Sequence, residues 1–166
     1  DAGRLPSVPF VLLPLPSNLA QQRQDAARFF AHPTRGMTAS PLPPRPAGAK
    51  IHIGYFSADF HNHAVPNAIA EMFECHDRTQ FEITAFQLAE RPRDSMHDRL
   101  RRTFDRFVDV TTISDYDVVT MARDLKIDIA MDLLGYTTDN RPGLFALRAA
   151  PGAAALLCRL CRPRNF

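Results

Sequence analysis

The chain has 166 residues, of which 45% are hydrophobic and 23% charged, and its formal net charge at pH 7 is +2. That length suits one domain with a sizeable core, and so small a charge argues against a nucleic-acid or anionic-membrane surface unless basic residues cluster locally. No apolar run approaches the roughly 20 residues of a membrane span, and the N-terminus lacks a signal-peptide pattern. Three cysteines do not make a disulfide framework, so we expect a cytoplasmic protein.

Residues 1–49 predict a proline-rich linker. Nine of the 14 prolines lie before Lys50, a density typical of a tether with extended pieces. Within it we expect one helix, which Ser17 caps and the pair His32–Pro33 ends. The run PLPPRP at residues 41–46 predicts a stiff spacer, and a ligand for a proline-recognition domain is the alternative.

From Lys50 onward, strand and helix patterns alternate. We expect strands at 51–56, 81–88, 107–110 and 127–133, and helices at 66–75, 94–104, 114–125 and 144–148. This order predicts an α/β fold with a Rossmann-like parallel sheet and right-handed crossovers, spanning residues 50–151. Among the histidines, we expect His52 to be partly exposed on the first strand and His97 to lie at the surface.

Polar loops follow the first and the last of these strands. Because the carboxyl ends of parallel strands share one edge, both loops should border one crevice. The residues placed there are Asp59, His61, Asn62, His63, Asp132, Tyr136, Thr137 and Arg141. A neutral imidazole can accept a proton or hold a hydroxyl group, so His63 is a candidate catalytic base, with a loop-stabilising role as the alternative.

The sequence does not predict a metal site. His61 and His63 could supply half of one, but no carboxylate or cysteine cluster completes the set. Cys158 and Cys161 have the spacing of a redox or zinc pair, but a second pair is missing, so we interpret this spacing as accidental.

Three motifs in order, GYFSADFHNHAV, FEITAF and DIAMDLLGYTTDNRPGLFALRAAP, resemble the catalytic region of the O-linked N-acetylglucosamine transferase and SPINDLY family, above all its bacterial members. The resemblance covers roughly Lys50 to Pro151. It implies the N-terminal lobe of a glycosyltransferase B-type fold, in which two Rossmann-like lobes hold the donor between them. Tetratricopeptide repeats precede this region in the family, and a repeat of about 34 residues is not visible in this chain.

The resemblance also implies site residues and a reaction. His63 matches the family's active-site histidine, proposed as the base for an acceptor Ser or Thr hydroxyl. Substrate-binding roles are implied for Asp59, Asn62, Gly135, Tyr136, Thr137 and Arg148. The implied reaction transfers N-acetylglucosamine from its uridine-diphosphate donor to a protein acceptor, without a metal or another cofactor.

After Pro151 the sequence departs from the family pattern. The family continues with an apolar strand and a Leu-Gly-Tyr-Pro-Gly-Thr loop, whereas this chain reads GAAALLCRLCRPRNF. We therefore expect residues 152–166 to be an aberrant tail that leaves the next strand position open. The open edge and the apolar surface beside it predict marginal stability and self-association.

The lobe that would bind uridine and diphosphate is missing from this sequence, so we expect the chain alone to be inactive. One alternative is a non-catalytic truncated remnant or binding piece. The other is a protein O-fucosyltransferase of the same family, because the residues that read the donor sugar would lie mostly in the missing lobe.

Overall fold

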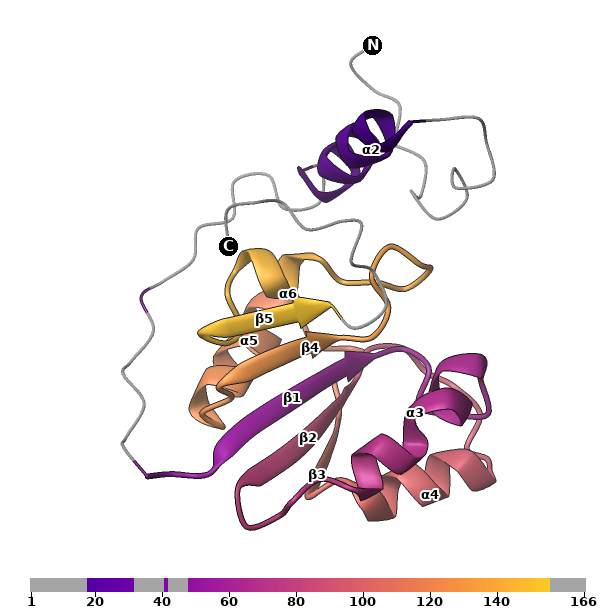
Figure 1. The fold of residues 1–166 in the computed structure, drawn as a ribbon, viewed down its shortest axis with the longest axis vertical. Coiled ribbons are helices and arrows are strands. Elements are labelled where there is room, and N and C mark those ends of the chain that lie inside the picture. The colour runs from indigo at the N-terminus through magenta and orange to yellow at the C-terminus, as the bar shows by residue number, and fades with distance from the viewer. Residues whose placement is uncertain (1–17, 32–40, 42–47, 156–166) are drawn as a thin grey trace.

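The computed structural model describes residues 18–31, 41 and 48–155. Ten elements succeed one another along these residues (Figure 1). They are α2 (Leu19–Ala31), β1 (Ile51–Ser57), α3 (Ala64–Glu74), β2 (Phe81–Gln87), α4 (Ser95–Thr103), β3 (Arg106–Asp109), α5 (Asp115–Asp124), β4 (Ile129–Asp132), α6 (Gly143–Ala146) and β5 (Gly152–Ala155). No helix in the described part of the chain is long and apolar enough to cross a membrane.

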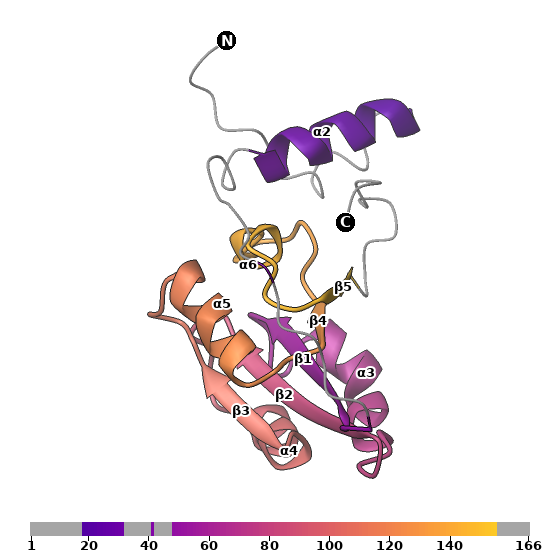
Figure 2. The same cartoon turned by 90° about the vertical axis from the view of Figure 1, so that its left-hand side faces the viewer.

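The strands form one parallel sheet in the order β3-β2-β1-β4-β5. Helices α3 and α4 cover one face, and α5 and α6 cover the other (Figures 1 and 2). Strand β1 lies at the centre and is buried along nearly its whole length, polar His52 and Ser57 included, as a central parallel strand is. The predicted Rossmann-like sheet is therefore confirmed.

Aromatic side chains fill the core on both faces of the sheet. On the α5 side, the rings of Phe56 and Phe86 stack with centroids 4.4 Å apart. On the α3 side, Tyr55 packs edge-on against Phe73, with centroids 4.9 Å apart. Gly54 lies between these layers, where a side chain would have no room.

The strand position after Pro151 is occupied, so the expectation of an open position there was wrong. Gly152 pairs with Ile129, and its N–H donates to the Asp128 carbonyl at 3.0 Å. Backbone groups form the hydrogen bonds between β4 and β5, so the small residues of β5 are sufficient. A strand of this kind does not need the alternating apolar residues by which strands are predicted from sequence. The rest of the predicted tail, residues 156–166, lies outside the described residues.

The N-terminal helix begins one residue later than we expected. Asn18 Oδ1 accepts from the Gln21 N–H at 2.9 Å, and Gln21 Oε1 accepts from the Asn18 N–H at 2.9 Å. This reciprocal pair is a capping box. Ser17, the expected cap, and the PLPPRP run beyond Pro41 lie outside the described residues, so the linker remains a prediction.

Both exposure predictions for the histidines were wrong, because neighbouring elements cover these positions. His52 is 6% exposed, and its ring nitrogens lie 2.8 Å from the Leu125 carbonyl and 2.8 Å from Thr84 Oγ1. His97 is 3% exposed, with Nδ1 3.0 Å from the Phe60 carbonyl. Each buried imidazole thus satisfies a buried polar group of another element.

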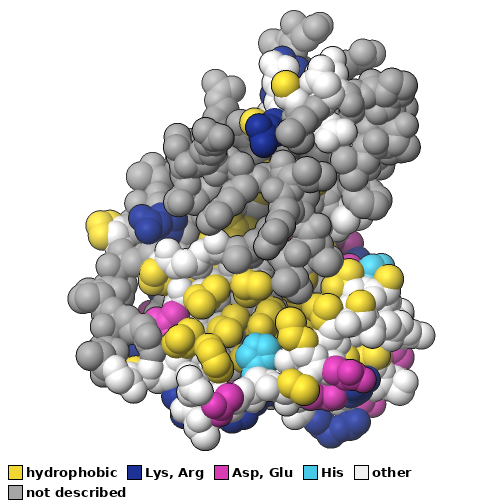
Figure 3. Space-filling model, viewed as in Figure 1, with side chains coloured by type: hydrophobic (Ala, Val, Ile, Leu, Met, Phe, Trp, Pro, Cys, Tyr) yellow, Lys and Arg dark blue, Asp and Glu magenta, His cyan; other side chains and the backbone are white. Residues whose placement is uncertain are grey.

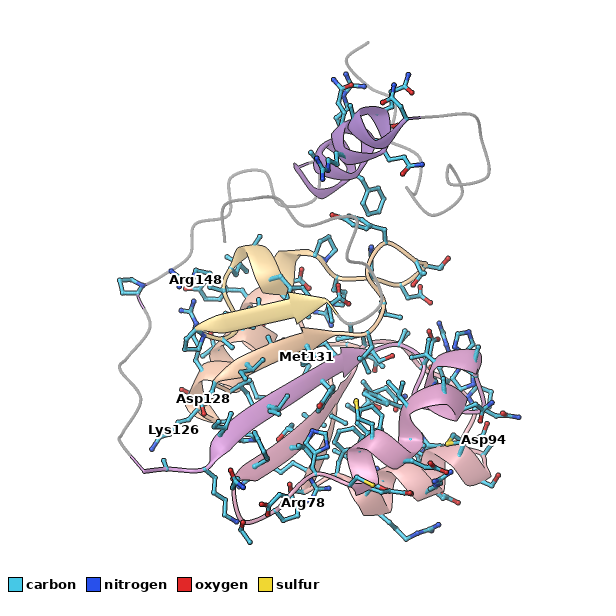
Figure 4. All side chains as sticks on the ribbon, viewed as in Figure 1. Arg78, Asp94, Lys126, Asp128, Met131 and Arg148 are labelled. Atoms are coloured by element: carbon cyan, nitrogen blue, oxygen red, sulfur yellow. The ribbon has the colours of Figure 1, made fainter. Side chains whose placement is uncertain are left out.

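The α3 side of the sheet is incompletely covered. Ile129 and Met131 of β4 are only partly buried, and no described helix lies over β4 and β5 on this side (Figure 1). Figure 3 shows hydrophobic side chains gathered there, and Figure 4 labels Met131. The apolar surface expected from the sequence is present.

Self-association through this surface remains a prediction. We expect the midpoint of thermal unfolding to rise with protein concentration, because burial of apolar surface between copies stabilises the folded state. Melting curves over a hundredfold range of concentration test this, with Met131→Lys as the variant that weakens the dependence. A midpoint independent of concentration would contradict it.

Gly54 offers a direct test of the core. A Cβ at this position would lie 3.0 Å from Ile127 Cγ2 and 3.1 Å from Phe86 Cε2. We expect Gly54→Ala to lower the free energy of unfolding by about 1–3 kcal/mol, as overpacking of a core does. Urea denaturation measures the loss, and Ala68→Ser on the exposed face of α3 is the control. An unchanged stability would mean that the packing around β1 is looser than described.

Candidate functional site

Two polar loops flank the point where the strand order reverses. Strand β1 pairs with β2 on one side and with β4 on the other, so the chain leaves the carboxyl end of β1 in one direction and that of β4 in the opposite one. Ligands of open α/β sheets bind at such a point, outside the carboxyl ends of the strands. The loops that follow β1 and β4 therefore form the candidate site.

The loop between β1 and α3 is fixed by the N-terminus of α4. Asp94 caps that helix by accepting from the His97 N–H at 2.9 Å, and its other oxygen accepts from the Asn62 N–H at 2.8 Å. These backbone hydrogen bonds lower the pKa of Asp94. The Asn62 side chain accepts from Asn67 Nδ2 at 3.1 Å, so this loop is tied to both α3 and α4.

His63 lies at the end of this loop, as the N-cap residue of α3. Its side chain is 45% exposed and makes no capping hydrogen bond. The carboxylate of Asp59 lies between two imidazoles, with Oδ2 3.7 Å from His63 Nδ1 and Oδ1 3.7 Å from His61 Nε2. The two rings have centroids 5.7 Å apart. The predicted cluster around His63 is thus assembled by one carboxylate.

Arg91, in the loop after β2, connects this cluster with the loop after β4. Its Nε lies 3.6 Å from Asp59 Oδ1, and its Nη2 donates to Asp139. The hydrogen bond to Asp139 is the main cause that raises the pKa of Arg91. The structure therefore brings the two polar loops together at one edge of the sheet, as the sequence predicted.

The loop after β4 is held by its own polar groups. Asp132 Oδ1 accepts from the Leu134 N–H at 2.9 Å and the Gly135 N–H at 3.0 Å. Gly135 has φ +60°, a left-handed conformation that costs glycine nothing. Thr137 Oγ1 donates to the Leu134 carbonyl at 3.0 Å. These bonds give the Gly-Tyr-Thr segment a compact turn.

Tyr136 lies in that turn and contacts the N-terminal helix. Its ring packs edge-on against Phe29 of α2, with centroids 5.8 Å apart. Sequence reasoning did not anticipate this contact, because α2 belongs to the segment predicted as a linker.

Arg141 is a structural residue of the site. Its guanidinium donates to Asp115 Oδ1 at 2.7 Å, to the Val110 carbonyl at 2.9 Å and to the Ile113 carbonyl at 2.6 Å. These bonds tie the loop after β4 to the loop before α5. The placement of Arg141 near the crevice was predicted, but its donors are directed at this framework.

Arg148 is not brought to this edge. Figure 4 shows it on the same side as Lys126 and Asp128, at the amino ends of the strands, whereas Asp94 lies on the opposite side. Its backbone carbonyl accepts from Arg123 in the last turn of α5. Helix α6 runs back across the sheet before this residue, which carries Arg148 away from the crevice. The substrate-binding role predicted for Arg148 rests on the resemblance alone.

Sequence reasoning missed Arg91, Asp94 and Asp139. Each lies in a loop beyond the carboxyl end of a strand, but only the three-dimensional structure shows that their side chains meet Asp59 or its neighbours. Among the residues that the structure describes, no group of three or more His, Cys, Asp or Glu side chains could hold a metal ion. Cys158 and Cys161 lie outside those residues.

Comparison with known proteins identifies relatives of the chain. The sequence profile of glycosyl transferase family 41 matches residues 39–159. The probable UDP-N-acetylglucosamine--peptide N-acetylglucosaminyltransferase SEC of Arabidopsis thaliana is 28% identical over 89% of this chain and 16% of that protein. The UDP-N-acetylglucosamine--peptide N-acetylglucosaminyltransferase of Caenorhabditis elegans is 31% identical over 63% of this chain and 9% of that protein.

A solved structure shows the same fold. A mutant of the Thermobaculum terrenum O-GlcNAc transferase superimposes with a TM-score of 0.77 at 27% identity, over 89% of this chain and 29% of that one. The predicted family and fold class are therefore confirmed. The chain spans less than a third of each of these relatives.

Asp132 gives the site a testable pH dependence. Burial raises the pKa of Asp132, so its ionisation is harder in the folded than in the unfolded chain. The folded state therefore loses stability as the pH rises from the unfolded pKa through the raised one. Asp132→Asn keeps an oxygen acceptor for both N–H groups and removes the charge. We expect the stability of the variant relative to the wild type to increase as the pH rises above the unfolded-chain pKa of aspartate, about 3.9.

Urea denaturation of both proteins at a series of pH values measures this difference. Asp124→Asn, on the exposed side of α5, controls for the loss of one negative charge. A stability difference between wild type and Asp132→Asn that stays constant with pH would contradict the burial of this carboxyl.

Proposed function

The chain belongs to glycosyl transferase family 41, and we propose that it forms the acceptor-side lobe of a protein O-glycosyltransferase. In this proposal N-acetylglucosamine passes from a uridine-diphosphate donor to a Ser or Thr hydroxyl of a protein. The observation that carries the proposal is the exposed imidazole of His63, which lies beside Asp59 at the edge where the loops after β1 and β4 meet. Relatives of the chain are named as peptide N-acetylglucosaminyltransferases, which supports the same reaction class.

His63 is the group that we propose to act on the acceptor hydroxyl. Nδ1 of His63 faces Asp59, so Nε2 carries the lone pair that can accept the hydroxyl proton. The hydroxyl oxygen then bonds to the anomeric carbon of the sugar. The bond from that carbon to the diphosphate oxygen breaks, and uridine diphosphate leaves with the electron pair.

The remaining predicted residues have supporting parts in this proposal. Asn62 fixes the loop that presents His63, through its hydrogen bonds to Asp94 and Asn67. Gly135, Tyr136 and Thr137 lie in the turn after β4, and in our proposal the partly exposed Tyr136 ring, which packs edge-on against Phe29, also contacts a sugar or peptide. The groups that bind uridine and diphosphate belong, in our proposal, to the part of the relatives that this chain does not span.

A metal-independent reaction in a cytoplasmic setting completes the proposal. A base and a bound diphosphate leaving group can carry out the transfer without a metal when fixed donors stabilise the leaving charge. Cys75 is an exposed free thiol, as is common in a reducing compartment.

An exchange of lobes tests the proposed function. We expect this chain alone to show no turnover of UDP-N-acetylglucosamine with a Ser/Thr peptide. A chimera in which residues 50–155 replace the matching lobe of the Thermobaculum terrenum enzyme should transfer the sugar, because the two lobes share their fold. His63→Ala in the chimera should lower kcat/KM by about 10²- to 10⁴-fold, the usual contribution of general acid–base catalysis.

His76→Gln is the matched control in that experiment, because this histidine contacts Tyr55 and the Met72 carbonyl, away from the proposed site. A chimera that folds and binds donor but does not transfer the sugar would contradict the proposal. Equal activity of the His63→Ala chimera and its parent would do the same.

A further inference from the structure

Asp59 contacts His61, His63 and Arg91, and this arrangement points to a role for its carboxylate. We infer that Asp59, held by Arg91, is a positioning residue that fixes the His63 ring with its proton on Nδ1 and its lone pair on Nε2. The catalytic meaning of this arrangement rests on the proposed function, in which Nε2 takes the acceptor proton. Neither residue touches the reacting atoms in this inference, and both act through His63.

The geometry of Asp59 is that of an orienting carboxylate. It is mostly buried, with 16% of its side chain exposed, and its backbone N–H donates to Ser57 Oγ at 3.0 Å. The Oδ2 atom faces His63 Nδ1 at 3.7 Å. A base whose other nitrogen faces a carboxylate is a recurrent arrangement in catalysis, and such contacts are often long until substrate binds. The carboxylate can accept a hydrogen bond from a protonated Nδ1 but cannot donate one to an unprotonated Nδ1. It therefore favours the tautomer that carries its proton on Nδ1.

Arg91 explains why Asp59 stays in this place. Its guanidinium is fully charged at any physiological pH, and it contacts Asp59 and Asp139, which belong to different loops. Arg91 thus holds Asp59 against movement toward solvent and keeps a cation beside its carboxylate. Without Arg91, the Asp59 carboxylate would keep only its contacts with the two imidazoles among the side-chain contacts described.

The two imidazoles beside Asp59 are not equivalent. The side chain of His61 is 17% exposed and that of His63 is 45% exposed. Of the two imidazoles, the more exposed one belongs to His63, which is the N-cap residue of α3. Arg91 and Asp94 are also at this edge, Arg91 against Asp59 and Asp94 bonded to the Asn62 N–H.

Nitrogen-15 NMR of the chain itself tests the inference, because it reports the tautomer of each imidazole without donor or acceptor. In spectra recorded at pH 8, we expect the His63 signals of the wild type to be those of the tautomer protonated at Nδ1. In Asp59→Asn and in Arg91→Met, the ratio of this tautomer to the other should fall by about fivefold, the scale of a partly exposed charged contact.

Two variants control the experiment. Arg91→Lys keeps a cation and should retain most of the wild-type ratio, and Arg93→Met removes a nearby exposed arginine and should leave the ratio unchanged. Backbone amide spectra verify folding. If Asp59→Asn does not fold, the comparison of Arg91→Met with Arg91→Lys is the test. A wild-type His63 protonated mainly at Nε2, or a ratio unaltered in Asp59→Asn and Arg91→Met, would overturn the inference. A failed sugar transfer by the chimera would instead count against the proposed function and leave the tautomer result intact.

Discussion

The parallel pairing of β1 with β2 on one side and β4 on the other is the constraint on which the rest of this structure depends. It forces the loops after these strands onto one edge of the sheet, where the strand order reverses. Arg91 then links two of those loops through Asp59 and Asp139. The polar edge is stable because its charges are paired with one another and with helix N-termini. An apolar crevice of the same shape would lack the groups to hold an imidazole in a defined orientation.

Much of this arrangement could be predicted from the sequence. Strand patterns separated by helix patterns imply parallel pairing through helical crossovers, which cover both faces of the sheet. The helix predicted over residues 114–125 forms as α5, and Ser114 caps it, because its Oγ accepts from the Asp117 N–H at 3.2 Å. The polar loop around His63 could be placed at the carboxyl edge for the same topological reason.

Features that depend on contacts between distant residues could not be predicted in this way. The three-dimensional structure decides which group an arginine contacts, so the sequence did not single out Arg91, which contacts Asp59. Arg141 was placed at the crevice, whereas its guanidinium donates to backbone carbonyls such as that of Val110. The burial of His52 and His97 depends on which backbone carbonyls face them. Strand β5 escaped prediction because alanines carry no period, and the backbone of β4 supplies the bonds that order it.

The central claim is that the loop after β4 lies against the loop that carries His63. A nitroxide on Thr138→Cys, with Cys75, Cys158 and Cys161 replaced by serine, measures this proximity through the broadening of histidine signals in NMR spectra. The account predicts strong broadening of the His63 ring signals and much weaker broadening of those of His76, at the far end of α3. Equal broadening of both rings, or an unaffected His63, would contradict it.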